Sequence, residues 1–223
     1  MSLTTLADAG WLRLPSGLSP AMLGALPVDV ALDAGDAGSR NLLERDWCAG
    51  LVSPIRSYLQ SIGALPADAV AVQCTLFRKT ADCNWKVPYH QDLSVPVAAR
   101  IEHPALSGWS MKEDGHYVQP PADVLDTLLA VRLHLDPSGS DEGALRVVPG
   151  SHRLGRLSAD CVATTEKREN EVVCTADAGD LLLMRPLLLH ASSKAERPNG
   201  RRVLHFLFAP RHPGSGLQWR IVV

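Results

Sequence analysis

The β character of the chain is clearest in one run near its carboxyl end, Arg201-Arg202-Val203-Leu204-His205-Phe206-Leu207-Phe208. Alternate residues of a strand point to opposite faces. Beyond Arg202 the even positions are all apolar, whereas the odd positions include Arg201 and His205. This pattern predicts a strand with one face for packing and a second, mixed face that can line a polar pocket.

Short β-rich runs separated by Pro, Gly, Asn and Asp follow one another after Pro66. Besides 201–208, they lie at 70–77, 85–97, 128–135, 144–148, 172–175, 180–184 and 187–190, with a last run at 218–223. Many short strands without long helices between them favour a sandwich or barrel over a βαβ sheet. We therefore expect a mainly β core over residues 67–223, within a single domain that spans 1–223.

Residues 1–66 are expected to form a helical cover for that core. Apolar residues recur at helical spacing from Leu42 to Leu59, and Ser39 could cap the helix. Pro54 falls inside the pattern, which predicts a kink or a break into two helices. Because an amphipathic helix must bury its apolar face, this one should lie against the sheet.

The stretch 98–126 is rich in Pro and Gly and is expected to be irregular. A long insertion in a compact β domain is usually a functional lid or a disordered loop. This one contains several aromatic or amide side chains, namely Trp109, His116, Tyr117 and Gln119. Their presence favours the lid.

The composition is that of an ordinary soluble globular protein, with 46% hydrophobic and 21% charged residues. A formal net charge of −2 gives no electrostatic reason to expect nucleic acid or an anionic membrane as partner. No apolar run approaches the roughly 18 residues that span a bilayer, and the first residues lack a signal-peptide pattern. The five cysteines form no Cys-x-x-Cys, which favours reduced thiols in a cytoplasmic protein. The oligomeric state stays open.

The strongest candidate for a metal site is His90-Gln91-Asp92. On a strand, His90 and Asp92 point to the same face while Gln91 points away. The pair alone is weak, because chance often supplies it and His90 could be a hydrogen-bonded strand histidine. His190 strengthens the case, since it ends an apolar run in which an imidazole is unexpected. Two imidazoles and one carboxylate can hold Fe(II) on one face and leave three positions open.

Arg201 lies eleven residues after His190 (201 minus 190), beyond a turn at 198–200. We expect this turn to make the strands of His190 and Arg201 neighbours. Strand parity, by which we mean the alternation of side chains between the two faces of a strand, places Arg201 on the mixed face together with His205. We therefore favour Arg201 over Arg202 as the residue that points into the site. The alternative is that both arginines are solvated turn residues.

These residues and one further motif resemble a known family. The motif is Gly143-Ala144-Leu145-Arg146-Val147-Val148-Pro149-Gly150-Ser151-His152. From about residue 70 to residue 209 the chain resembles the phytanoyl-CoA dioxygenase family of Fe(II)- and 2-oxoglutarate-dependent oxygenases. The resemblance implies a double-stranded β-helix, or cupin-like jelly roll, with His90, Asp92 and His190 as iron ligands. It also implies that Arg201 binds the distal carboxylate of 2-oxoglutarate.

The same resemblance implies a reaction in which O2 and 2-oxoglutarate are consumed at the iron to hydroxylate a C–H bond, with succinate and CO2 released. Arginine suits the distal carboxylate because its planar guanidinium binds both oxygens and keeps its charge. In related halogenases a small residue replaces the aspartate, so the intact Asp92 favours hydroxylation over halogenation. We expect a small-molecule substrate, whose identity the sequence leaves open.

Strand parity adds five residues that could line the pocket. Gln73 and Thr75 are expected beside the co-substrate, and Trp85 is expected as a wall near the substrate. Arg132 and His134 share the even side of the strand 127–136. If the odd, apolar side packs under the helix, both point into the barrel and Arg132 favours an anionic substrate; if not, both are exposed.

Two alternatives to the oxygenase stay open. The first is a different metal-dependent, cupin-like enzyme that does not use 2-oxoglutarate. The second is a catalytically degenerate jelly-roll module that binds metal without turnover. Arg201 argues against the first, because only the 2-oxo acid mechanism needs it, and the intact set of three ligands plus Arg201 argues against the second.

Overall fold

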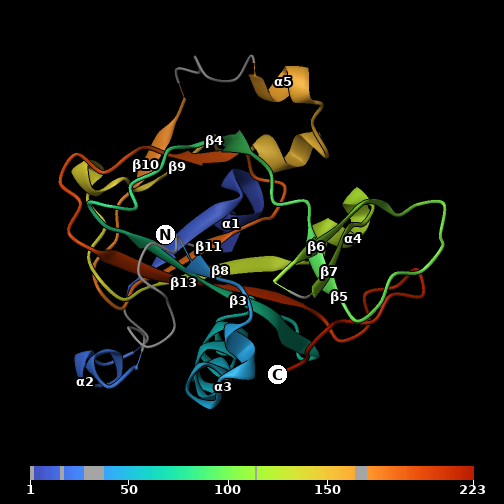
Figure 1. Ribbon diagram of the computed structural model, residues 1–223, viewed down its shortest axis with the longest axis horizontal. Coiled ribbons are helices and arrows are strands. Elements are labelled where there is room, and N and C mark those ends of the chain that lie inside the picture. Colours follow the sequence, from blue (N-terminus) through green and yellow to red (C-terminus); the bar gives the residue numbers. More distant parts are fainter. Residues whose placement is uncertain (1–2, 16–17, 28–37, 114, 164–169) are drawn as a thin grey trace.

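The computed structural model describes residues 3–15, 18–27, 38–113, 115–163 and 170–223. Two antiparallel sheets face each other across the interior of the molecule (Figure 1). The larger has six strands in the order β1 (Trp11–Leu14), β11 (Leu181–Met184), β8 (Leu129–His134), β13 (Arg201–Pro210), β3 (Ala69–Lys79) and β2 (Gly38–Ser39). The smaller has four, in the order β10 (Val172–Cys174), β9 (Leu145–Val147), β12 (His190–Ser192) and β4 (Val87–His90). This architecture is the expected mainly β, cupin-like jelly roll.

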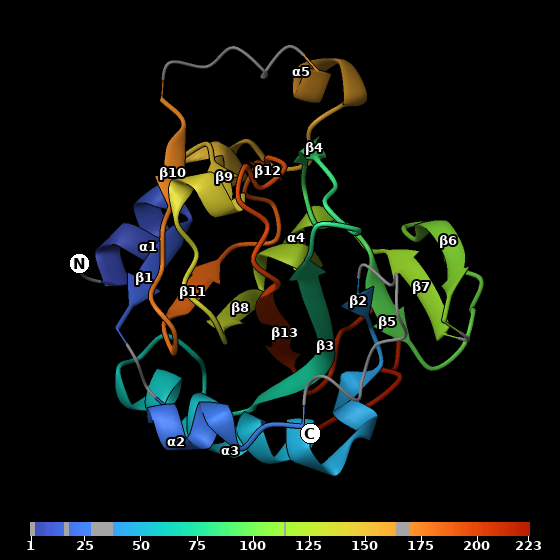
Figure 2. The same ribbon diagram turned by 60° about the vertical axis from the view of Figure 1, so that its left-hand side comes forward.

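The outer face of the large sheet is covered by the helix α3 (Asp46–Ser61), as Figure 2 shows. Leu204, Phe206 and Phe208 of β13 are fully buried in the same core as Ile55 and Leu59 of α3. Each such side chain contributes roughly 1.5–3 kcal/mol by leaving water. The prediction that the even, apolar positions of 201–208 form a packing face is therefore confirmed.

The amino-terminal part is less purely helical than expected. It contains the short helices α1 (Leu3–Ala9) and α2 (Pro20–Gly24) and the 3-10 turn η2 (Leu42–Glu44). β1, however, adds an edge strand to the large sheet by pairing with β11. The predicted start of the long helix was wrong: Ser39 lies in β2, and α3 begins only at Asp46.

Pro54 does not break α3 into two helices, which was one of the two outcomes predicted for it. A proline inside a helix leaves the carbonyl of the residue four positions earlier without its usual partner. That residue is Gly50, and both Gly50 and Pro54 are exposed. Water can therefore satisfy the free carbonyl, while the apolar face around Ile55 stays buried.

The stretch 98–126 is irregular up to residue 106, but the prediction of an irregular insertion was wrong for the strands and the helix that follow. It forms the strands β6 (Ser107–Lys112) and β7 (Gly115–Gln119) and the helix α4 (Ala122–Asp126), and β7 pairs with β5 (Val95–Val97). Glycine is uncommon inside strands, and Gly108 lies within β6. It sits with φ +58° where the β6–β7 register shifts, a bulge that only glycine adopts easily.

Three smaller expectations also differ from the structure. Residues 218–223 form no full strand, although Val223 exchanges two backbone hydrogen bonds with Ala71. The apolar run before His190 is a buried turn, and β12 starts at His190 itself. The strands of His190 and Arg201 are not neighbours, because β12 and β13 belong to opposite sheets.

The remaining short helices lie in connections between strands: η3 (Ser140–Glu142), η4 (Ser151–Leu154) and α5 (Ala159–Ala163). Among the helices of the described residues, none has the length and apolar character needed to cross a bilayer. His152, the last residue of the motif 143–152, lies in η4, and its Nε2 contacts the carbonyl oxygen of Ala7 at 3.1 Å.

Candidate metal centre

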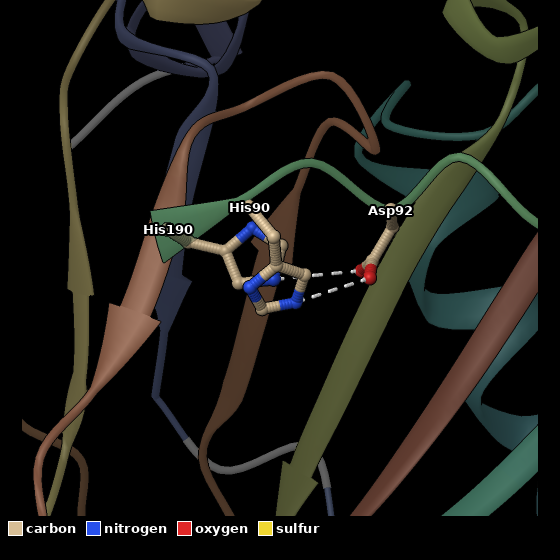
Figure 3. Close-up of side chains that lie close together, drawn as sticks. All are labelled: His90, Asp92 and His190. Atoms are coloured by element: carbon tan, nitrogen blue, oxygen red, sulfur yellow. Dashed lines mark ion pairs between the residues drawn. The ribbon is translucent and has the colours of Figure 1, made fainter. Parts of the chain in front are cut away.

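His90, Asp92 and His190 converge on one point between the two sheets (Figure 3). His90 closes β4 and is the register partner of His190 on β12. Nε2 of each imidazole lies 3.7 Å from an oxygen of Asp92, and the candidate ligand atoms all lie within 4.8 Å of one another. Imidazole nitrogens and carboxylate oxygens are ligands that divalent transition metals bind, and here they lie on one side of an open space. We call the point on which they converge the metal point.

Asp92 reaches this point from a loop, so the strand argument for it was wrong in detail. β4 ends at His90, two residues earlier. The loop is held instead by the backbone N–H of Asp92, which donates to the carbonyl of Pro186 at 2.8 Å, and by Gln91. The Gln91 side chain points away from the metal point, as predicted, and bonds the backbone of Gly155, Leu157 and Leu187 at 2.7–2.9 Å.

The proton of each candidate imidazole is placed by its backbone partner. Nδ1 of His90 lies 2.9 Å from the carbonyl oxygen of Pro88, and Nδ1 of His190 lies 2.8 Å from that of Leu188. A carbonyl only accepts, so Nδ1 carries the proton in both rings. The lone pair of each Nε2 is left facing Asp92, which is the tautomer that metal binding requires.

The protonation states of His190 and Asp92 also suit metal binding. Burial lowers the pKa of His190 to about 4, although the nearby Asp92 opposes that shift. For Asp92, burial raises the pKa, but His190 and His205 outweigh it and the net direction is downward. At neutral pH His190 is therefore neutral and Asp92 charged, the states in which they can act as ligands.

His205 stands behind Asp92 and is oriented by Arg132. Nδ1 of His205 lies 3.2 Å from a guanidinium nitrogen of Arg132. Because arginine only donates, Nδ1 must accept, and the His205 proton is on Nε2, 3.9 Å from the carboxylate of Asp92. This places an N–H beside the candidate metal ligand, as in many metal sites where an outer residue orients a carboxylate.

A cavity of about 360 Å³ opens directly beside the three candidate ligands. Gln73, Thr75, Trp85, Arg132 and Arg201 line it, as parity suggested. The odd positions of β8 pack toward α3, the first of the two orientations considered, which turns Arg132 inward.

His134 is the one predicted pocket residue that the structure does not bring to the cavity. It lies level with Val203, two positions along β8 from the pair formed by Arg132 and His205. It is fully buried, burial lowers its pKa to about 3, and within the described part of the chain neither ring nitrogen has a hydrogen-bond partner.

One end of the cavity holds two buried cations, Arg201 and Lys79, which are register partners. Arg201 is 4% exposed and donates to Ser138 Oγ at 2.7 Å, while its Nε finds no partner among the residues described. Lys79 is 2% exposed and donates to Ser192 Oγ at 3.1 Å and to the carbonyl of Ser193. Burial, with Arg201 second, lowers the pKa of Lys79 to about 8.

Lys79 and Ser192 were not predicted as cavity residues, although the alternation of side chains along their strands could have identified both. Lys79 shares the parity of Gln73 and Thr75 on β3, and Ser192 shares that of His190 on β12. Arg202 behaves as parity predicted, since its guanidinium bonds Asp136 at 2.8–3.0 Å on the other face.

Solved structures share this fold at low sequence identity. The non-haem alpha-ketoglutarate-dependent epimerase SnoN from nogalamycin biosynthesis matches with a TM-score of 0.64 and 14% identity over 96% of this chain and 85% of SnoN. HygX from Streptomyces hygroscopicus, with nickel and 2-oxoglutarate bound, matches with a TM-score of 0.65 and 14% identity over 94% and 85%. The carbocyclase SnoK matches with a TM-score of 0.63 and 14% identity over 96% and 87%. At this identity the likeness bears on the fold alone.

No curated protein sequence matches the chain. The family model described as "Phytanoyl-CoA dioxygenase (PhyH)" matches residues 32–203. That range covers well over half of the chain and includes the three candidate ligands and Arg201. The chain therefore belongs to the phytanoyl-CoA dioxygenase family.

Proposed function

We propose that the protein is an Fe(II)- and 2-oxoglutarate-dependent dioxygenase that hydroxylates an unactivated C–H bond of a small molecule. The observation that carries this proposal is the pairing of two features in one cavity. His90, Asp92 and His190 present two imidazoles and one carboxylate at one point. A buried arginine with an unused N–H, Arg201, lies at the end of the same cavity.

His90, Asp92 and His190 would hold the iron through two Nε2 atoms and a carboxylate oxygen. Bound iron, with O2 and 2-oxoglutarate, would supply the oxidising power for C–H cleavage, and succinate and CO2 would leave as co-products. The protein contributes the ligand protonation states and the N–H of His205, which lies 3.9 Å from the carboxylate of Asp92.

Arg201 would bind the distal carboxylate of 2-oxoglutarate. Its guanidinium is buried, and Ser138 satisfies one of its nitrogens. Lys79 and Ser192 lie beside it and would complete the anion site, with Thr75 along the wall toward the metal and Gln73 next to Thr75 beyond it. A dianion would neutralise two buried cations that otherwise repel each other.

We propose that the 223 residues act as one catalytic domain on a small-molecule substrate in the cytoplasm. All five cysteines are free, and three of them are buried, which fits a reducing compartment. The two non-oxygenase alternatives are less well supported. An enzyme without 2-oxoglutarate gives Arg201 no role, and a degenerate module gives no reason to retain all of the donors with their protons placed.

The decisive experiment measures succinate release from 2-oxoglutarate with Fe(II), ascorbate and a panel of small molecules. A substrate should raise succinate release and gain one oxygen atom by mass spectrometry. A product formed without added oxygen would reassign the outcome to epimerisation or ring closure, the reactions named for SnoN and SnoK.

Removing a candidate ligand should abolish that turnover. His90→Ala or Asp92→Ala should lower succinate release by at least on the order of 100-fold, because a two-donor site binds iron weakly. His212→Ala is the matched control, since His212 is exposed and does not line the cavity. Retained turnover in His90→Ala with an unchanged fold would refute the iron assignment.

A further inference from the structure

The cavity is longer than the 2-oxoglutarate site alone requires, and its second part has its own character. Along β3 and β13 it runs from the pair Lys79–Arg201, past Thr75–His205, to Gln73–Leu207. Lys79 and Gln73 are six positions apart, which is about 20 Å of strand at 3.4 Å per residue. Asp92 lies beside His205 and hence near the middle of this line.

The part beyond the metal point is walled mainly by apolar groups. Leu93, Val95, Leu128, Pro186 and Leu207 line it. Tyr117 of β7 closes it on the side of the small three-stranded sheet β5-β7-β6. A carbon skeleton placed there would lie next to the iron and opposite the 2-oxoglutarate end.

Lys112 of β6 adds a cation to this part, next to Arg40. Its Nζ lies 4.8 Å from the centre of the Tyr117 ring, and the side chain lines the cavity. Burial first and Arg40 second lower its pKa, while Asp92 opposes that shift. Within the described residues no carboxylate forms an ion pair with Lys112, whereas Arg40 beside it is paired with Glu113 at 3.1 Å.

In the lining of the whole cavity, positively charged side chains outnumber negatively charged ones. Its described lining carries five lysine and arginine side chains, Arg40, Lys79, Lys112, Arg132 and Arg201, against one carboxylate, Asp92. Iron(II) would add two positive charges and 2-oxoglutarate two negative ones, so the cofactors leave the excess unchanged. A second anion is electrostatically favoured, and Lys112 is the cation that faces the substrate part.

We propose that the substrate is a small carboxylic acid with an apolar carbon skeleton, whose carboxylate binds Lys112 while the skeleton lies between Tyr117 and the iron. This inference rests on the proposed oxygenase function and specifies its substrate class. A carboxylate fits better than a phosphate, because Lys112 is a single ammonium and Glu113 already neutralises Arg40.

The test uses the holoenzyme loaded anaerobically with Fe(II) and 2-oxoglutarate. Calorimetric binding is measured for a panel of matched pairs, each an aliphatic or aryl-substituted carboxylic acid and its primary amide, such as 3-phenylpropanoate and 3-phenylpropanamide. Acids should bind at least about 10-fold more tightly than their amides, the usual gain from a charge-assisted hydrogen bond. Lys112→Met should remove that preference, and Lys112→Arg should keep it.

Lys86→Met is the matched control, because Lys86 is exposed and lies outside the cavity lining. Equal binding of acids and amides, failure of every acid to bind at millimolar concentration, or an acid preference that survives in Lys112→Met would overturn the proposal. These outcomes are separable from failure of the oxygenase assignment. Binding of Fe(II) and 2-oxoglutarate, and slow succinate release without substrate, do not require Lys112.

Discussion

Three imidazoles near the metal point have their protons fixed by what they contact. Backbone carbonyls hold the protons of His90 and His190 on Nδ1, and Arg132 holds that of His205 on Nε2. The first two rings can therefore donate electron pairs, while the third can only donate a proton toward Asp92. Ring identity alone would not distinguish a ligand from its supporting residue.

His205 should therefore matter for metal affinity without touching the metal. We expect His205→Phe to weaken Fe(II) binding by about 10- to 100-fold, since Asp92 loses its neighbouring N–H. His205→Gln, which can still donate, should recover most of the affinity. Competition with a metal chelator measures both, and equal affinity in the wild type and His205→Phe would show that His205 only fills space.

Lys79 is predicted to serve ligand binding at the expense of stability. Its pKa falls from 10.5 to about 8 on folding, so the unfolded chain binds more protons between these two pH values. The stability of the wild type should therefore rise with pH across this window. Lys79→Met, which removes the buried charge, should be more stable by roughly 1–3 kcal/mol below pH 8.

Urea denaturation of the ligand-free protein at pH 7 and near pH 10 tests this. The advantage of Lys79→Met should be full at pH 7 and shrink toward zero by about pH 10.5, while affinity for 2-oxoglutarate falls. Lys86→Met, at an exposed position, should show neither effect. An advantage independent of pH would point to packing and not to charge.

At the scale of elements, the connection from β4 to β5 positions the metal ligands. Gln91 joins it to the turn before β12 and to the segment after η4 through three hydrogen bonds. Gln91→Leu would leave two carbonyls and one N–H without that partner in a buried place. We expect the free energy of unfolding to fall by about 2–4 kcal/mol, and Fe(II) affinity to fall with it.

Denaturation and metal titration of Gln91→Leu give the two quantities. Gln60→Leu is a suitable control, because Gln60 also bonds two backbone carbonyls but lies on α3, away from the site. Loss of stability without any loss of metal affinity would mean that Gln91 supports the fold and not the ligand geometry.

The same elements show how far sequence reasoning reaches. Alternation along β13 and β3 placed Arg201, Gln73 and Thr75 in the cavity, because a strand fixes the side on which each residue lies, whereas it left the direction of Arg132 on β8 open. It chose Asp92 for the wrong reason, since the loop after β4 has no such period. The β6–β7 hairpin was not predicted, because glycine is typical of loops and yet Gly108 lies within a strand of this hairpin.

On the scale of the whole molecule, the pairing of strands lay beyond local pattern. The turn at 198–200 suggested that the strands of His190 and Arg201 were adjacent, yet they belong to opposite sheets. Which sheet a strand joins depends on which distant segments bury each other's apolar faces, and a short strand is compatible with several pairing partners. The family resemblance supplied the jelly roll, and the family match confirms it.

The spacing of residues along β13 has a consequence for the proposed use of 2-oxoglutarate. His205 lies beside Asp92, and Arg201 lies four positions away on the same face of the same strand, which is about 14 Å at 3.4 Å per residue. The backbone of one strand would therefore fix the distance between the bound iron and the guanidinium. A diacid one carbon shorter, such as oxaloacetate, should bind more weakly because it could not reach both ends, and the preference for a five-carbon 2-oxo diacid would follow from the strand itself.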